Sequence, residues 1–293
     1  MLEFNSIQEL VDDAVKAGKN ISDIVLEAQT VEIGRSSKEL YDEMARNLKV
    51  MQEAVNSGIQ PGIRSSSGLS GGNAYKMKQA VDNNKTLGGR ILGSTLVKAL
   101  AVAEINACMG RIVAAPTAGS CGILPAILIT FMEERDIPEE KVVMGLFTAG
   151  GIGMVIAKKA SISGAEGGCQ AECGSASAMA AAALVEMAGG TPEMAANACA
   201  MALKNVLGLV CDPVAGLVEV PCIKRNASGA ANALICADMA LAGIESTIPA
   251  DEVIGAMKSI SSIMAPALKE TSEGGLAATP TAKRLAKEIF GEQ

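Results

Sequence analysis

The chain has 293 residues, of which 49% are hydrophobic, so it can bury a sizeable core and is not an intrinsically disordered protein. Its formal net charge of −7 argues against a nucleic-acid partner, because proteins that bind the phosphate backbone concentrate Lys and Arg. Aromatic residues make up only 2% of the chain, whereas Ala, Gly and Met are frequent, and such small or flexible side chains predict closely packed helices.

The N-terminal region is predicted to be helical and partly exposed. It begins MLEFNSIQELVDDAVKAG, which has no basic segment followed by an apolar run, so a signal or transit peptide is not expected and the sequence predicts a cytoplasmic protein. Apolar side chains recur at helical spacing at Ile7, Leu10, Val11 and Ala14, and again at Leu40, Met44, Leu48 and Met51. We therefore expect residues 1–60 to form a peripheral helical region.

A segment rich in Gly and Ser follows this region. Gly58 and Pro61 end the helical pattern, and residues 63–73 read IRSSSGLSGGN, which is not a regular element. Its hydroxyl groups and free backbone amides suit an anionic group such as a carboxylate or a phosphate. The alternative is an exposed, flexible loop with no ligand.

The stretch from Ile112 to Met132 has no charged residue and is long enough to span a bilayer. It contains Pro116 and Pro125, which would leave backbone groups unpaired in lipid. The stretch is therefore predicted to be a buried loop and helix, with no membrane partner.

From about residue 89 to residue 290 the pattern predicts one helix after another. Helix-start signals occur at Pro138, Thr191 and Pro249, and strand periodicity is nearly absent. Charged residues are sparse between residues 142 and 203, which predicts helices in the interior of the domain. With no repeat and no linker, we expect an all-α, mainly helical single domain over 1–293, with a buried apolar core in 61–293.

The chain contains no His, which excludes Ser–His and Cys–His catalysis and His-ligated zinc within it. A catalytic base must then be Lys, Glu, Asp or Tyr, or come from a partner chain. The run Gly150-Gly151-Ile152-Gly153 does not continue as a dinucleotide-binding fingerprint, so close helix packing is the better explanation.

Eight cysteines in a chain without a secretory signal are poor candidates for disulfides. Cys169 and Cys173, four residues apart, could share a helix face, but no further Cys follows at ferredoxin spacing. Any iron–sulfur cluster would therefore take its ligands from separated segments. The alternative for each cysteine is a small buried core residue.

Three strings carry a resemblance to a known family: RIVAAPTAGSCG (111–122), GGCQAE (167–172) and LGLVCDPVAGLVEVPCIKRN (207–226). They resemble the α subunit of iron–sulfur L-serine dehydratases, and the likeness extends from the Ser-rich segment to about Leu241. The resemblance implies a lyase of serine catabolism and gluconeogenesis that converts L-serine to pyruvate and ammonia.

The resemblance also implies the ligands of a [4Fe–4S] cluster, namely Cys169, Cys211 and Cys222. Three thiolates leave one iron open, and this iron would act as a Lewis acid on the substrate hydroxyl. Because no Cys follows Cys236, water or a partner group must complete the cluster. The remaining thiols are expected to belong to the core: Cys108, Cys121, Cys173, Cys199 and Cys236.

Further implications concern the substrate and the partner. Ser65, Ser66 and Ser67 are expected to hold the carboxylate of L-serine, with Arg64 nearby for charge and Thr117 lining the pocket. The family's candidate base is a His in its β part, so the resemblance implies a β subunit and a hetero-oligomer.

Two other readings remain. A pyridoxal-phosphate lyase could use Lys76 or Lys78, but such enzymes usually alternate strands and helices. A non-enzymatic helical scaffold or membrane-associated subunit would leave the cysteine-bearing strings unexplained.

Overall fold

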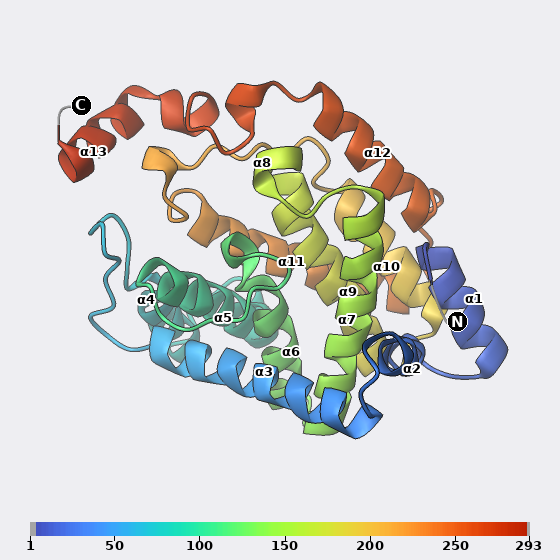
Figure 1. Cartoon of the computed structure of the whole chain (residues 1–293). Coiled ribbons are helices and arrows are strands. Elements are labelled where there is room, and N and C mark those ends of the chain that lie inside the picture. The colour runs from blue at the N-terminus through green and yellow to red at the C-terminus, as the bar shows by residue number, and fades with distance from the viewer. Residues whose placement is uncertain (1–3, 292–293) are drawn as a thin grey trace.

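The computed structural model describes residues 4–291. Within this range the chain forms helices and turns without any β-strand, which confirms the predicted all-α, single-domain fold (Figure 1). The α-helices are α1 (Ile7–Ala17), α2 (Ile21–Ile33), α3 (Ser37–Gly58), α4 (Asn73–Asp82), α5 (Gly89–Ala107), α6 (Ile123–Glu134), α7 (Glu139–Lys159), α8 (Gly164–Gly167), α9 (Ser175–Met187), α10 (Pro192–Lys204), α11 (Cys222–Leu241), α12 (Ala250–Ile263) and α13 (Pro280–Phe290). Short turns of other helix types are η1 (Ala118–Ser120), η2 (Gln170–Gly174), η3 (Val214–Gly216), η4 (Pro266–Leu268) and η5 (Gly275–Ala278).

The three predicted helix starts are confirmed. α7 begins directly after Pro138, and α12 begins directly after Pro249. Before α10, the Thr191 hydroxyl accepts a hydrogen bond from the backbone N–H of Met194, and Pro192 occupies the first helical position. A side-chain oxygen and a proline at these positions satisfy or remove backbone donors that the helix leaves unpaired.

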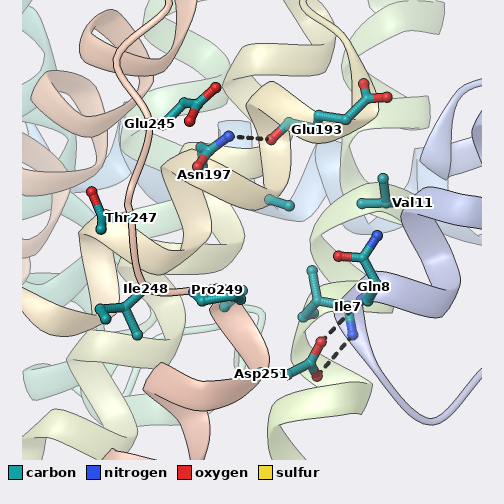
Figure 2. Close-up of a pocket in the computed structure, with 12 residues that line it drawn as sticks. Ile7, Gln8, Val11, Glu193, Asn197, Glu245, Thr247, Ile248, Pro249 and Asp251 are labelled. Carbon is teal, nitrogen blue, oxygen red and sulfur yellow. Dashed lines mark hydrogen bonds between the residues drawn. The ribbon is translucent and has the colours of Figure 1, made fainter.

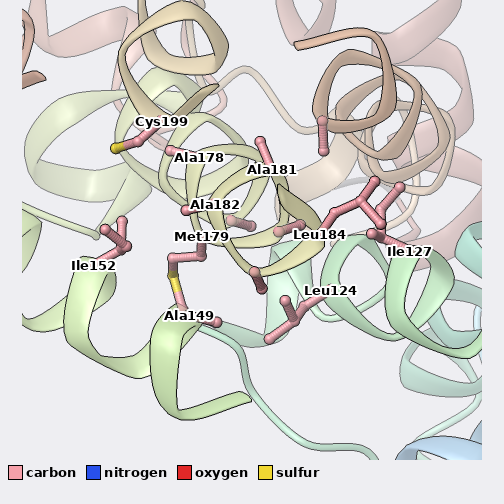
Figure 3. Close-up of a cluster of buried hydrophobic side chains, with 14 of the residues drawn as sticks. Leu124, Ile127, Ala149, Ile152, Ala178, Met179, Ala181, Ala182, Leu184 and Cys199 are labelled. Atoms are coloured by element: carbon pink, nitrogen blue, oxygen red, sulfur yellow. The ribbon is translucent and has the colours of Figure 1, made fainter. Parts of the chain in front are cut away.

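α9 is the central helix of the fold. Its sequence is SASAMAAAALVEM, and every residue except Glu186 is buried. α6, α7, α10 and α11 all pack against it. Figure 3 shows the methyl groups of Ala178, Ala181 and Ala182 between side chains of these neighbours, such as Ile127 and Ile152. Methyl side chains let helix axes approach closely, as the composition predicted.

The glycines of α7 serve the same close packing. A Cβ at Gly151 would clash with a methyl group of Val25 in α2, and one at Gly153 would lie 3.0 Å from Met179 in α9. Gly151 and Gly153 therefore permit close helix packing, as preferred from the sequence, whereas a Cβ at Gly150 would meet nothing within 4 Å.

The N-terminal helices contribute to the same core. Ile7, Leu10, Val11 and Ala14 are all buried, as their spacing predicted, and they belong to one cluster of buried side chains with α7 and α9. α2 packs on α7, and α3 packs on α5. The boundary expected at residue 60 stays a prediction.

The uncharged stretch from Ile112 to Met132 forms a loop, the turn η1 and most of α6, as predicted. A different helix, α7, is the one candidate in the described chain that is long and apolar enough to cross a membrane. Of its most apolar window, 67% is buried inside the protein, which is typical of a core helix.

Candidate functional site

Three of the predicted cysteines lie on different elements that meet beside α9. Cys169 directly precedes η2, a π-helical turn that leads into α9, and Cys222 is the first residue of α11. Cys211 lies in the loop between α10 and η3, where its backbone exchanges hydrogen bonds with Leu268 and Glu270. All three cysteines are buried: the exposed fraction is 2% for Cys169, 3% for Cys211 and 7% for Cys222.

The three thiols are close enough to influence one another's ionisation. Burial raises the pKa of Cys222 to about 12, and negative charge on Cys169 adds to this effect. Burial and the charges on Cys169 and Cys222 also raise the pKa of Cys211. Thiols that repel one another's negative charge in this way need a cation to become thiolates together.

Cys169 is the exception among them. A hydrogen bond from the Cys173 thiol lowers the pKa of Cys169, burial opposes this, and the positive charge of Arg225 lowers it further. Cys173 is fully buried one helical turn away, and its own pKa is raised by the same hydrogen bond. The two cysteines share one face of the helix, as their spacing predicted.

Glu172 connects Thr117 to the region of the thiols through a hydrogen bond. The Thr117 hydroxyl donates a short hydrogen bond to the half-buried Glu172 carboxylate, whose pKa is raised by burial. A Cβ at Gly119 would lie 2.5 Å from this carboxylate, so the turn around η1 closes directly over it. On the other side, a Cβ at Gly164 would lie 3.5 Å from Glu172 and 3.0 Å from the Cys211 sulfur. The carboxylate thus lies between Thr117 and Cys211.

The Ser-rich segment is hydrogen-bonded to the loop that precedes α11. Ser67 donates a hydrogen bond of 2.7 Å to Glu219, and Ser70 donates a shorter one to the second oxygen of the same carboxylate. Glu219 is only 4% exposed and lies three residues before α11 begins. Ser65 is buried and contacts Ser67, whereas Ser66 and Arg64 are exposed. The segment therefore lies next to the stretch that carries Cys211 and Cys222.

Sequence reasoning assigned no role to Glu172, Glu219 or Arg225. Each of them lies inside one of the three strings that carry the resemblance, within three residues of Cys169 or Cys222. That position was the only signal that could have identified them.

A single metal ion and an iron–sulfur cluster place different demands on the cysteine ligands. In the described part of the chain, no three His, Cys, Asp or Glu side chains converge tightly enough to hold a single metal ion. A [4Fe–4S] cluster binds its thiolates on different irons, so it needs them further apart than a single ion does. Three buried thiols that are close enough to affect one another's ionisation, with a guanidinium nearby, fit such an anionic cluster.

A cavity of about 550 Å³ opens beside Cys173 and Arg225. It is lined by Cys173, Asn205, Val206, Leu207, Gly208, Leu209, Arg225, Ser228 and Gly229. A smaller cavity of about 220 Å³ lies between α1, α10 and α12 (Figure 2). Its carboxylate Asp251 accepts hydrogen bonds from the backbone N–H groups of Ile7 and Gln8, and so caps α1. Neither of these two cavities is lined by a predicted site residue.

Cys121, Cys199 and Cys236 are buried, whereas Cys108 is half-buried and donates a hydrogen bond to the backbone carbonyl of Arg64, so Cys108 is not the core residue that was expected. Burial raises the pKa of both Cys121 and Cys199 to about 12. Cys199 packs against α9 in the core (Figure 3). Burial also raises the pKa of Cys236, to about 11. These thiols are protonated at neutral pH, as expected of small core residues.

The fold and the site define a class of protein: a helical chain whose functional centre is a set of buried thiols gathered from separate segments. The sequence profile of the serine dehydratase alpha chain family matches residues 16–277, so the chain belongs to this family.

Relatives cover nearly the whole chain. It is 54% identical over 289 residues to the probable L-serine dehydratase, alpha chain, of Bacillus subtilis, covering 98% of this chain and 96% of the relative. It is 43% identical over 288 residues to the L-serine dehydratase, alpha chain, of Peptoniphilus asaccharolyticus, covering 98% and 99%. An L-serine dehydratase of Streptomyces coelicolor is 40% identical over 281 residues, which are 94% of this chain but only 60% of that protein.

Proposed function

We propose that this chain is the α subunit of a cytoplasmic L-serine dehydratase that converts L-serine to pyruvate and ammonia. The observation that carries the proposal is the meeting of Cys169, Cys211 and Cys222 at one buried site in a chain of this family. The names of its relatives support the substrate and the class of reaction.

Cys169, Cys211 and Cys222 are the proposed ligands of a [4Fe–4S] cluster with one iron free of protein ligands. When bound, the cluster supplies a Lewis acid for the hydroxyl group that leaves the substrate. The protein excludes bulk water from the three sulfurs by burying them, and Arg225 offsets part of their negative charge.

The substrate is proposed to bind between the thiols and the Ser-rich segment. Ser66 and Arg64 are exposed and can meet the substrate carboxylate, while the hydrogen bonds to Glu219 hold Ser67 and the segment in place. Thr117 borders the same space through its hydrogen bond to Glu172. The roles of Ser65, Ser66, Ser67 and Thr117 in binding are part of this proposal.

A β subunit is proposed to complete the enzyme as a hetero-oligomer. Two of the relatives are named alpha chains, and the L-serine dehydratase of Streptomyces coelicolor extends well beyond the region that this chain matches. Because the chain has no His, the base that removes the α-proton of serine is proposed to come from this partner.

The pyridoxal-phosphate alternative gains no support from its lysines. Lys76 is exposed on α4, and Lys78 forms an ion pair of 2.5 Å with Asp82 on the same helix. The scaffold alternative does not account for the buried thiols of the cysteine-bearing strings.

The test is anaerobic purification of the chain with its β partner, followed by measurement of iron, sulfide and pyruvate formed from L-serine. About four iron and four sulfide per chain are expected, as for one [4Fe–4S] cluster. Each of Cys169→Ala, Cys211→Ala and Cys222→Ala should lose the cluster and the activity. Cys199→Ala, in the core, is the matched control and should keep both.

Two results would overturn the proposal. One is full pyruvate formation by a preparation that contains no iron. The other is a Cys→Ala variant at one of the three proposed ligands that binds iron and sulfide as well as the Cys199→Ala control does.

A further inference from the structure

We propose that Arg225 is the positioning residue of the cysteine site: it fixes the three thiols relative to one another and sets the electronic properties of the group they hold. The inference rests on the proposed function, because it concerns the same site. It is carried by the position of a single guanidinium, which extends from the helix of Cys222, contacts both neighbours of Cys211 and places its charge near Cys169.

Arg225 lies on α11, one helical turn after Cys222. Its guanidinium donates a hydrogen bond of 2.7 Å to the backbone carbonyl of Val210 and lies 2.9 Å from the carboxylate of Asp212. These two residues flank Cys211 on either side. The same guanidinium lies close enough to Cys169 for its positive charge to act on that sulfur. One side chain therefore lies close to the segments of Cys169, Cys211 and Cys222.

Asp212 holds the guanidinium in its orientation. This carboxylate is only 3% exposed, and its other oxygen accepts a hydrogen bond of 2.7 Å from the backbone N–H of Leu276. The oxygen that faces Arg225 is buried and makes no hydrogen bond elsewhere in the described chain, so the ion pair is its polar contact. Arg225 and Asp212 are thus fixed by each other and by the C-terminal segment.

The chemistry of the site requires a group of this kind. Three thiolates around an anionic cluster repel one another, and a buried cation offsets this repulsion. Arginine is suited to the role because its planar guanidinium carries five donors and can meet several acceptors at fixed angles. A lysine would supply the charge as a single point and could not reproduce the geometry.

A positive charge near a ligand sulfur also changes the cluster to which that sulfur belongs. Hydrogen bonds and positive charge near the sulfurs raise the reduction potential of an iron–sulfur cluster, because they stabilise the more negative reduced form. A residue that only supported the fold would not shift this potential in a correctly folded protein. The reduction potential therefore separates a positioning role from a purely structural one.

The experiment compares Arg225→Gln and Arg225→Lys with the wild-type chain, each purified anaerobically with the β subunit and reconstituted with ferrous iron and sulfide. Arg90→Gln is the control, because Arg90 forms its ion pair with Glu134 and is 80% exposed. The readouts are iron and sulfide bound per chain, the visible absorption spectrum and the reduction potential. Circular dichroism checks that each variant is folded.

Arg225→Gln is expected to weaken cluster binding roughly 10- to 100-fold, in line with other residues that support metal ligands, and to lower the reduction potential. Arg225→Lys keeps the positive charge, so its reduction potential should lie between those of Arg225→Gln and wild type. It should bind the cluster less tightly than wild type does. Arg90→Gln should match wild type in every readout.

The inference is overturned if folded Arg225→Gln binds the cluster with wild-type affinity, spectrum and potential. Should Arg225→Gln fail to fold, wild-type affinity and spectrum in Arg225→Lys overturn it instead. If wild type and the Arg90→Gln control also bind no cluster, the proposed function itself fails, and this inference fails with it.

Discussion

Glu186 is the one residue of α9 that is partly exposed, and its carboxylate is nevertheless affected by burial. It accepts a hydrogen bond of 3.2 Å from the backbone N–H of Ser22 at the start of α2. Burial raises the pKa of Glu186, while the hydrogen bonds from Ser22 act in the opposite direction. The contact joins α2 to the central helix, but the folded protein disfavours the charged form of this side chain.

The raised pKa of Glu186 makes the stability of the fold depend on pH. Because the pKa of Glu186 is higher in the folded than in the unfolded chain, its contribution to stability is fully present below the ordinary Glu value of 4.5 and is lost as the pH rises through the folded value. The Glu186→Gln variant has no such proton to lose. Its free energy of unfolding relative to wild type should therefore increase between about pH 5 and about pH 8.

Chemical denaturation of the isolated chain at both pH values measures this difference. Glu53→Gln, at an exposed position within α3, is the control for removal of a surface charge and should show no comparable change. A difference for Glu186→Gln that stays constant or shrinks as the pH rises would contradict the prediction.

At the scale of helices, some glycines are needed for two helices to pack closely, and others have open space beside them. A Cβ at Gly58, near the end of α3, would clash with the backbone carbonyl of Ala101 in α5. Nothing lies within 4 Å of a Cβ at Gly255, which is exposed in the middle of α12. The same substitution at the two positions should therefore have opposite effects.

Gly58→Ala should destabilise the fold by about 1–3 kcal/mol, because the α3–α5 contact must open. Gly255→Ala should stabilise it by about 0.5–1 kcal/mol, because alanine restricts the unfolded chain more than glycine does. Denaturant-induced unfolding, followed by circular dichroism, measures both. Equal effects of the two substitutions would show that the α3–α5 crossing can relax freely.

Helices whose ends are marked by local residues could be predicted from the sequence, and others could not. Thr191 and Pro192, at the N-cap and the first position of α10, mark the start of this helix in the sequence itself. α4 was not predicted as a helix of its own, because its N-terminal N–H groups are capped by Glu104, a buried residue of α5 about thirty positions away. A cap supplied by another helix leaves no local signal.

The candidate site likewise combines residues that the local sequence marks with contacts between distant residues. The cysteines could be predicted as ligands because they lie in recognisable strings, whereas the hydrogen-bond partners of Thr117 and Ser67 could not be predicted. Glu172 is 55 residues from Thr117, and Glu219 is 152 residues from Ser67. Only the folded chain pairs them, so spacing in the sequence contains no information about these contacts.

At the scale of the whole molecule, stability is expected to be unevenly distributed. α9 is buried along almost its full length, whereas Ala282 is the one buried residue of α13. α13 lies at the opposite end of the molecule from α1 and packs mainly against η3 and η5 (Figure 1). Local opening should therefore cost much less free energy in α13 than in α9.

Hydrogen exchange measured by mass spectrometry tests this expectation. Peptides from α9 should exchange only through global unfolding, and peptides from α13 should exchange through local opening at much lower free energy. Addition of denaturant should separate the two classes, because local opening depends only weakly on denaturant. Equal protection of α9 and α13 would mean that the C-terminal helix unfolds together with the core.

The alanine-rich surface of α9 also limits how this protein can change over evolutionary time. Four helices contact α9 across methyl groups, so a larger side chain at one of these alanines has to displace a whole neighbouring helix. Compensation would require simultaneous changes on two elements, which single mutational steps do not provide. Divergence should therefore accumulate on exposed helices such as α13, while α9 stays nearly fixed in lineages that otherwise drift far apart.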